Sequence, residues 1–212
     1  MARSFTQREL AEKYNRFARW YDLVEGIPDL LGIRKLRRRL LERVSGTVLE
    51  VAVGTGKNLR FYPHASRVIA VDFSTEMLKV ARRRSENLPM ECNFLLADAE
   101  ALPFASESIG TVVTSLSSCT FSNPVAALHE ISRVCKPDGR VFLLEHGRSD
   151  REWLAAFQDR HAERFAQPLG CHWNREPQEI ARASGLEIIE ARRYFFGIFH
   201  LIAAVPQSAK AE

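Results

Sequence analysis

A glycine-containing turn and the strand before it form the most informative chemical pattern in the sequence. The apolar run Val48 to Val53 leads directly into Gly54-Thr55-Gly56, and a helical segment follows. In open α/β folds such a turn lies at the carboxyl end of a sheet strand, where ligands bind. Gly54 and Gly56 let the main chain approach a ligand closely and adopt positive φ. The turn alone is weak evidence, because any tight strand-to-helix connection needs glycine.

Two acidic residues that end later apolar runs strengthen the pattern. Asp72 follows the turn by about 20 residues, the spacing at which an acid meets ribose hydroxyls in dinucleotide-binding folds. Asp98 ends the third run, where its carboxylate could accept from an adenine amino group. Each acid alone could equally be a helix N-cap or turn residue. Their order and spacing together predict a site for a nucleoside-containing ligand.

Histidine and cysteine residues further along the chain could supply other chemistry. His146 follows a fifth apolar run and could act as a general base, although a structural histidine is an equal alternative by position. Cys171 and His172, together with His146, could also hold zinc. No regular ligand spacing supports such a site, so the sequence predicts no metal.

An α/β sheet is needed to position these residues. After residue 46, short β-branched runs alternate with helical segments, which is typical of a parallel sheet with helices on both faces. The last two runs, Leu186 to Tyr194 and Ile198 to Val205, have no helix between them and should pair as an antiparallel hairpin. We therefore expect a doubly wound, mostly parallel seven-stranded sheet. The other strands are expected at Thr47–Val53, Arg67–Val71, Asn93–Leu96, Thr111–Ser115 and Arg140–Glu145, and helices from Leu59, Ser74 to about Asn87, Pro124 to about Cys135, Asp150 to about Phe165 and Glu176 to Ser184.

The first 45 residues show a helical pattern instead. Leu10, Tyr14 and Tyr21 recur at helical spacing, and a second apolar set begins at Ile33. We expect residues 1–45 to form an N-terminal helical cap on a sheet domain of residues 46–206, followed by a tail of residues 207–212. A chain of 212 residues without repeats or linkers suits one domain.

Composition excludes several classes of protein. With 46% hydrophobic and 26% charged residues, the chain is typical of neither disordered nor integral membrane proteins. Its net charge of +4 gathers at Arg34 to Arg43, which is interpreted as a solvated helix face, with contact to an anionic membrane surface as the alternative. No nucleic-acid motif accompanies this stretch, so nucleic acid is not an expected partner. The longest apolar run is shorter than the ~20 residues that span a bilayer.

In its central part the sequence resembles the class I S-adenosylmethionine (SAM)-dependent methyltransferases. The matching segments are VLEVAVGTG, VDFSTEML, LLADAEALPF and ALHEISRVCKPDGRVFLLE. The resemblance implies a Rossmann-like methyltransferase fold and S-adenosyl-L-methionine as cofactor. In-line methyl transfer mainly requires that the acceptor be positioned and desolvated, so no catalytic triad is expected.

The resemblance also assigns roles to the residues around the turn. Glu50 and the backbone from Gly54 to Gly56 would face the methionine part of SAM, and Asp72 would bind the ribose. Asp98 and the backbone of Ala99 would contact the adenine edge. The expected cofactor-binding set is completed by Thr55 and Asn58.

Further cofactor contacts are implied on either side of the nucleoside. Phe73 or Met77 would pack on the adenine, while Ser115 and Leu116 would line the floor near the donor methyl. Ala52 stands where the family usually has glycine. Quinone C-methyltransferases also accept alanine there, so Ala52 is expected to remain part of the binding site.

Three segments are expected to border the methyl acceptor: the helix with Tyr14 and Tyr21, the segment from Glu145 to Ser149, and the segment from Gly170 to Glu176. The helix with Tyr14 and Tyr21 resembles the aromatic entrance helix of quinone and phosphatidylethanolamine methyltransferases, although these tyrosines could simply pack the helix. The segment from Gly170 to Glu176 resembles a branch that contains thiol methyltransferases, and Asn174 should cap the next helix. We expect Tyr14, Tyr21 and His146 to be catalytic, and Tyr14, Tyr21, Arg148, His172, Trp173 and Asn174 to bind the acceptor.

The sequence therefore predicts a SAM-dependent methyltransferase for a small or lipid-like acceptor. A thiol is favoured, and a phospholipid headgroup amine or a quinone ring carbon is the alternative. A non-catalytic SAM-binding or RNA-associated module is the alternative from another class. A nicotinamide oxidoreductase is disfavoured because the turn lacks the third glycine of Gly-x-Gly-x-x-Gly. The absence of Cys-x-x-Cys pairs and of a secretory leader favours the cytoplasm, with peripheral membrane contact as an alternative.

Overall fold

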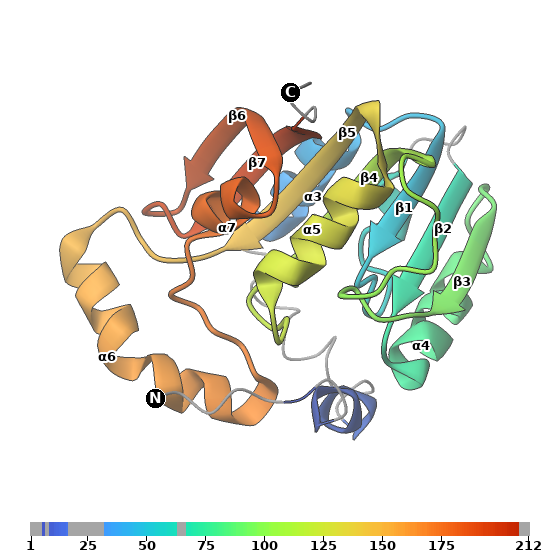
Figure 1. Cartoon of the computed structure of the whole chain (residues 1–212). Helices are drawn as coiled ribbons and strands as arrows, with labels where there is room; N and C mark the ends of the chain where they lie inside the picture. Colours follow the sequence, from blue (N-terminus) through green and yellow to red (C-terminus); the bar gives the residue numbers. More distant parts are fainter. Residues whose placement is uncertain (1–5, 7–8, 17–31, 63–66, 208–212) are drawn as a thin grey trace.

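Seven strands pair into a single sheet in the computed structural model, which describes residues 6, 9–16, 32–62 and 67–207 (Figure 1). The strands are β1 (Thr47–Val51), β2 (Arg67–Asp72), β3 (Cys92–Leu96), β4 (Ile109–Ser115), β5 (Cys135–His146), β6 (Leu186–Tyr194) and β7 (Phe199–Pro206). Their order is β3-β2-β1-β4-β5-β7-β6, and the first five pair in parallel. β7 is antiparallel to both β5 and β6. The expected doubly wound sheet and C-terminal hairpin are confirmed.

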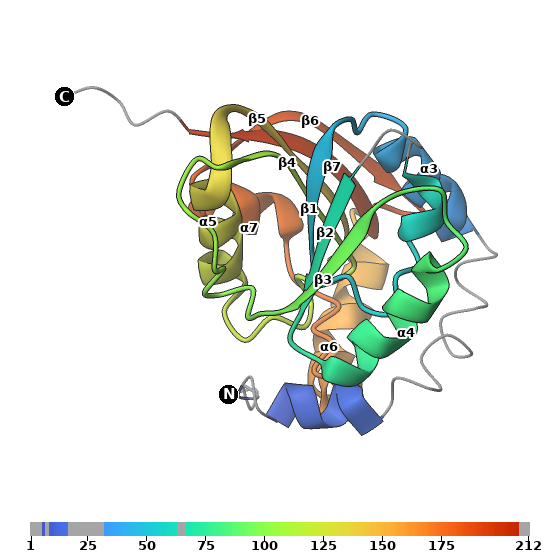
Figure 2. The ribbon, with the colours of Figure 1, turned by 90° about the vertical axis from the view of Figure 1, so that its right-hand side faces the viewer.

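Helices cover both faces of the sheet. They are α3 (Arg34–Leu41), the 3₁₀ turn η2 (Leu59–Phe61), α4 (Thr75–Ser85), α5 (Pro124–Val134), α6 (Glu152–Leu169) and α7 (Pro177–Ala183). α3 and α4 lie on one face, and α5 and α7 lie on the other (Figure 2). α6 and the helix over residues 9–16 lie instead beyond the carboxyl ends of the parallel strands (Figure 1).

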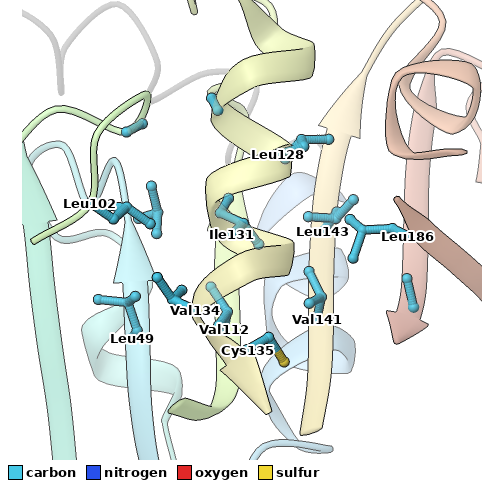
Figure 3. Close-up of a cluster of buried hydrophobic side chains, with 14 of the residues drawn as sticks. Leu49, Leu102, Val112, Leu128, Ile131, Val134, Cys135, Val141, Leu143 and Leu186 are labelled. Atoms are coloured by element: carbon cyan, nitrogen blue, oxygen red, sulfur yellow. The ribbon is translucent and has the colours of Figure 1, made fainter. Parts of the chain in front are cut away.

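Buried aliphatic side chains hold these layers together. Leu128 and Ile131 of α5 pack with Leu49, Val112 and Leu143 of the sheet (Figure 3). Each fully buried Leu or Ile side chain contributes about 1.5–3 kcal/mol by removal of apolar surface from water. On the other face, α3 buries its leucines in the cluster that contains β1 and β5 residues. The sheet is therefore rigidly supported on both sides of the strand ends.

Local capping explains where two of the helices begin. The Ser74 side chain accepts from the Met77 amide at 3.1 Å, so α4 begins at Thr75. The Asn123 side chain likewise accepts from the Ala126 amide, and Pro124 occupies the first turn of α5. Both caps place the start of a helix directly after a sheet strand or its connecting loop.

The structure differs most from the expected elements at two points. The helix expected from Leu59 is only the short turn η2, since the chain becomes extended at Tyr62. β5 begins at Cys135, five residues before the expected Arg140, because residues 135–139 continue the strand across a register shift opposite β4. Tyr21, which is expected at the acceptor, lies outside the described residues.

The arginine-rich segment Arg34 to Arg43 also differs from the expected solvated helix face, at one residue. Arg34, Lys35, Arg38 and Arg39 are exposed on α3, as a solvated helix face requires. Arg37 is only 5% exposed and faces inward. The interpretation of the whole stretch as a solvated face is therefore wrong at Arg37, whose charge is enclosed by the fold. Among the described residues, no helix is long and apolar enough to cross a membrane.

Candidate active site

A cleft of about 570 Å³ opens at the carboxyl ends of β1, β2 and β4. Of the residues expected to bind the cofactor, it is lined by Glu50, Ala52, Gly54, Thr55, Asn58, Asp72, Phe73, Met77, Ser115 and Leu116. Gly56, Asp98 and Ala99 do not line it. The strand-to-helix turn, the end of β2 and the end of β4 thus meet at one place, as the spacing of the sequence predicts.

The two glycines of the turn serve different purposes. Gly54 has a φ of 57°, and a Cβ built on it meets nothing within 4 Å, so the main chain is open to a ligand. Gly56 has a φ of 78°, and a Cβ there would lie 2.8 Å from Leu59 and 3.1 Å from Ala81. Gly54 therefore gives a ligand access to the main chain, while Gly56 lets the turn pack against α4.

Ala52 adopts a conformation that normally favours glycine. Its φ is 56°, in the left-handed region. An L-residue pays roughly 1–2 kcal/mol to occupy this region. The structure thus gives the physical reason for the glycine usual in the family at this position, and shows that alanine is accommodated with strain.

Asp72 is held at the end of β2 by two main-chain amides. Its Oδ2 accepts from Gly54 N at 2.8 Å and its Oδ1 from Ser74 N at 2.9 Å. Burial raises the pKa of the Asp72 carboxyl to about 6, and the backbone hydrogen bonds oppose this shift. Each carboxylate oxygen retains a second lone pair, and the residue lines the cleft. The carboxylate is therefore fixed and can still accept from ligand hydroxyls.

Glu50 lies at the centre of a buried polar network. Asn58 Nδ2 donates to Glu50 Oε1 at 2.8 Å and to Ser115 Oγ at 3.0 Å. Arg37 Nη1 donates to Asn58 Oδ1 at 2.8 Å. Burial raises the pKa of Glu50 to about 7, and the hydrogen bond from Asn58, the nearby Tyr62 hydroxyl and the charge of Arg37 oppose this shift. Sequence reasoning missed Arg37, whose only signal was a cation within the apolar stripe of α3.

These features fit the methionine and ribose parts of SAM. Glu50 Oε2 is buried, and among the described residues no donor meets it with hydrogen-bond geometry; the Tyr62 hydroxyl lies near Glu50 and is likewise buried without a hydrogen bond. An unpaired buried carboxylate oxygen is costly unless a donor reaches it, and the ammonium group of SAM is such a donor. Asp72 presents acceptors suited to the ribose hydroxyls, and the main chain at Gly54 is open. The residues present therefore suit the cofactor.

The expected adenine contacts are only partly assembled. Ala99 lines a second cavity of about 240 Å³, which shares Ala52, Asp72 and Phe73 with the cleft. Phe121, which the sequence did not single out, also lines it. The Asp98 side chain lines neither cavity, and its Oδ1 accepts from Glu100 N at 2.8 Å. Asp98 thus makes the turn contact that was its alternative role.

The helix over residues 9–16 closes the cleft from one side. Tyr14 is buried, lines the cleft and packs edge-on against Phe73 with ring centroids 5.8 Å apart. Asn15 Oδ1 accepts from Ser74 Oγ at 2.6 Å, and Lys13 Nζ donates to Gln167 O at 2.6 Å. The helix is therefore tied to the β2–α4 connection and to the end of α6, which places Tyr14 beside the cofactor residues.

The other residues expected at the acceptor do not line the cleft. Arg148 pairs with Asp159 at 3.1 Å, and Trp173 stacks on Phe165 with ring centroids 4.0 Å apart. Asn174 donates to Asp159 at 3.0 Å, whereas Glu176 is the N-cap of α7, so the expected cap at Asn174 is wrong. The ion pair joins the segment after β5 to α6, and the ring stack and the hydrogen bond join the segment after α6 to the same helix. These side chains therefore contact one another and not the cleft. His172 and His146 lie beside two cysteines.

Glu145 is a functional residue that sequence reasoning passed over. It is 1% exposed at the end of β5, and its Oε2 accepts from Ser117 N at 3.0 Å and Ser118 N at 3.1 Å. Burial raises the pKa of this carboxyl, and the hydrogen bonds oppose the shift. Ser117 lines the cleft. Glu145 thereby fixes the loop after β4, and its signal was a lone acid ending an otherwise apolar strand.

Comparison with known proteins agrees with this geometry. Residues 49–143 match the methyltransferase domain family model. The chain is 35% identical to a phosphatidylethanolamine N-methyltransferase of Cereibacter sphaeroides over 73% of this chain and 78% of that protein. It is 35% identical to a demethylmenaquinone methyltransferase of Renibacterium salmoninarum over 65% of this chain and 58% of that protein.

A longer relative and a solved structure extend the comparison. The chain is 30% identical to the mitochondrial methyltransferase OMS1 of Saccharomyces cerevisiae over 93% of its length, but it spans only 46% of OMS1. It shares its fold, at 19% identity and a TM-score of 0.73, with a chain of the complex between the Haloferax volcanii Trm112 methyltransferase activator and a methyltransferase, over 96% of this chain and 100% of that one. The chain therefore belongs to the class I SAM-dependent methyltransferases.

Proposed function

We propose that this methyltransferase acts on a lipid-like acceptor, with a phospholipid headgroup amine as the first candidate and a quinone ring carbon as the second. SAM supplies an electrophilic methyl group, so the chain must bring a nucleophile in line with it and exclude water. The similarity to the phosphatidylethanolamine and demethylmenaquinone methyltransferases supports this class of acceptor.

Exposed aromatic side chains beyond the strand ends are the observation that carries the proposal. Trp153, Phe157 and Phe165 of α6 are 70%, 47% and 48% exposed. Phe195 and Phe196, in the β6–β7 turn, are also exposed, and Asp150 N donates to Phe196 O beside the start of α6. Aromatic side chains exposed together favour contact with an apolar surface or ligand. We call Trp153, Phe157, Phe165, Phe195 and Phe196 the aromatic surface.

The proposed arrangement places the acceptor between the cleft and the aromatic surface. Tyr14 lines the cleft and is proposed to position the acceptor against the cofactor. Lys13 Nζ donates to Gln167 O, so its helix contacts the end of α6. An acceptor dissolved in a membrane would be reached by peripheral contact through the aromatic surface. We therefore propose that the protein is cytoplasmic and makes peripheral contact with the membrane.

Methyl transfer to defined acceptors tests this proposal. The full chain is incubated with tritiated-methyl SAM and vesicles that contain phosphatidylethanolamine, vesicles that contain a demethylated quinol, or small alkyl thiols. The expected result is labelled product in the vesicle lipid. Label found only in the thiols would overturn the lipid acceptor and restore the thiol expected from the sequence. Tight SAM binding without product from any arm would favour the non-catalytic alternative.

A further inference from the structure

Two cysteines and a histidine from three separate segments converge beside the cleft. Cys119 follows β4, His146 ends β5 and Cys171 follows α6. One ligand atom from each lies within 4.8 Å of the others, and His146 Nε2 is 3.4 Å from Cys171 Sγ. The sequence had paired His146 and Cys171 with His172. The structure adds Cys119 to them, and the long spacing explains why no motif revealed the set.

The separations suit a small tetrahedral ion. Zinc binds thiolate sulfur at about 2.3 Å and imidazole nitrogen at about 2.0–2.1 Å, so neighbouring ligand atoms lie roughly 3.5–3.8 Å apart. The observed atoms are within an ångström or so of that arrangement, a difference that side-chain rotation can close. Two thiolates and one imidazole form a soft ligand set that favours Zn²⁺ over Mg²⁺ or Ca²⁺.

The segments that carry these ligands are already fastened to one another. His172 N donates to Cys119 O at 2.9 Å. The Arg175 guanidinium donates to Ser118 O and, at 3.0 Å, to Phe121 O. Glu145 holds the same loop through the Ser117 and Ser118 amides. A preorganised ligand set loses little conformational entropy when an ion binds.

Charges around the cluster are compatible with a divalent cation. Two thiolates neutralise Zn²⁺, while the buried Glu145 carboxyl and the Arg175 guanidinium carry opposite charges nearby. The thiolate is the form of cysteine that binds metal.

We propose that Cys119, His146 and Cys171 bind one Zn²⁺ ion and leave its fourth coordination position for water or an external ligand. The cluster lies behind the wall of the cleft, since Cys119 Sγ is 3.8 Å from Leu116 O and Thr120 is a lining residue. The ion would join the ends of β4 and β5 to the segment after α6. This role assigns His146 to the metal rather than to a general base.

Cobalt binding to the full chain tests the site. Protein kept reduced and stripped with a chelator is titrated with Co²⁺, which gives thiolate-to-cobalt charge-transfer bands and tetrahedral visible bands when bound by such ligands. The expected result is saturation at one equivalent, and loss of the bands on addition of one equivalent of Zn²⁺. No bands from reduced protein, with Cys119 and Cys171 joined in a disulfide after exposure to air, would show a thiol pair instead and overturn the proposal.

Matched variants locate the bound ion. Cys119→Ser and Cys171→Ser should each weaken Co²⁺ binding more than ~100-fold, a larger loss than a change outside the ligand shell causes. Cys92→Ser, on β3 and outside the cluster, should bind Co²⁺ like the parent. Retained SAM binding shows that each variant is folded. Parent-like Co²⁺ binding by both cluster variants would overturn the proposal.

Discussion

The cofactor side and the acceptor side of the cleft are built in different ways. On the cofactor side, Glu50, Gly54 and Asp72 come from consecutive β-α connections, and buried hydrogen bonds fix each of them. On the acceptor side, α6 and the helix over residues 9–16 lie beyond the sheet, and α6 exposes aromatic residues. Short-range sequence order determines the first region, whereas contacts between distant segments determine the second. Recognition of the donor is therefore built into the fold, and recognition of the acceptor is added to it.

Replacing Asp72 tests the cofactor side most strongly. Asp72→Asn keeps the shape but removes the charge and one acceptor, so SAM binding should weaken by about 1.5–3 kcal/mol, or roughly 10- to 150-fold in Kd. Isothermal titration with SAM measures this. Asp138→Asn is the matched control, because Asp138 is exposed near the start of β5. Equal losses of SAM affinity in the two variants would show that the Asp72 carboxylate makes no specific contact with SAM.

The pH dependence of SAM binding sharpens the role of Glu50. Its pKa is about 7 in the ligand-free fold, so the carboxylate that would pair with the ammonium is protonated as pH falls from 8 to 6. SAM affinity should fall roughly 10-fold over that range, since a one-unit step below a pKa leaves about a tenth of the group ionised. Glu50→Gln should bind more weakly at pH 8 and show a flatter profile. If the pH profile of Glu50→Gln ran parallel to that of the parent, Glu50 would be excluded as the group that pairs with the SAM ammonium.

The same shift predicts an effect on stability without ligand. The folded pKa of Glu50 lies above its ordinary value of 4.5, so its contribution is most favourable below pH 4.5 and is lost as pH rises through about 7. The free energy of unfolding of the parent, relative to Glu50→Gln, should therefore decrease from pH 5 to pH 8. Urea unfolding at several pH values measures the difference in free energy of unfolding between the parent and Glu50→Gln. A difference that does not change with pH would contradict a cost for burying the ionised Glu50 carboxylate.

Changing the aromatic surface should affect the acceptor and leave the donor unaffected. Trp153→Ala removes a side chain that is 70% exposed, so the fold and SAM affinity should be unchanged. Loss of apolar area should weaken vesicle binding by about 1 kcal/mol and lower turnover on lipid acceptors several-fold. Vesicle sedimentation and methylation assays measure these effects. Ile189→Ala, which changes an exposed apolar residue on β6, is the control. An equal effect in this variant would show that α6 contributes no more to vesicle binding than another exposed apolar site.

Ala52→Gly tests the strain at the turn and should have the smallest effect. Glycine relieves the left-handed conformation, at roughly 1–2 kcal/mol, but loses more chain entropy on folding, at roughly 0.5–1 kcal/mol. A gain of up to about 1 kcal/mol in the free energy of unfolding is expected, with SAM affinity retained. Thermal and urea unfolding measure the gain. A clear destabilisation would show that the alanine methyl group contributes essential packing.

The same division explains which features could be predicted from the sequence. Short β-branched runs that alternate with helical segments, together with the Gly54–Gly56 turn, predict the sheet, its hairpin and most of the cofactor residues, because these signals are local in the sequence. The roles of Arg37, Glu145 and Cys119 could not be predicted. Their partners lie 21 residues or more away, and only the packed sheet brings them together. Asp98 makes a local turn contact through Oδ1, and its expected contact with adenine stays a prediction.

A crystal structure with S-adenosylhomocysteine tests the central claim most directly, since it shows both ends of the nucleoside cleft at once. The expected result places the ligand amino group on Glu50 Oε2, the ribose hydroxyls on Asp72 and the main chain of Gly54 against the ligand. A ligand bound elsewhere, with Glu50 and Asp72 making only their present internal contacts, would contradict the assignment of this cleft to the methyl donor.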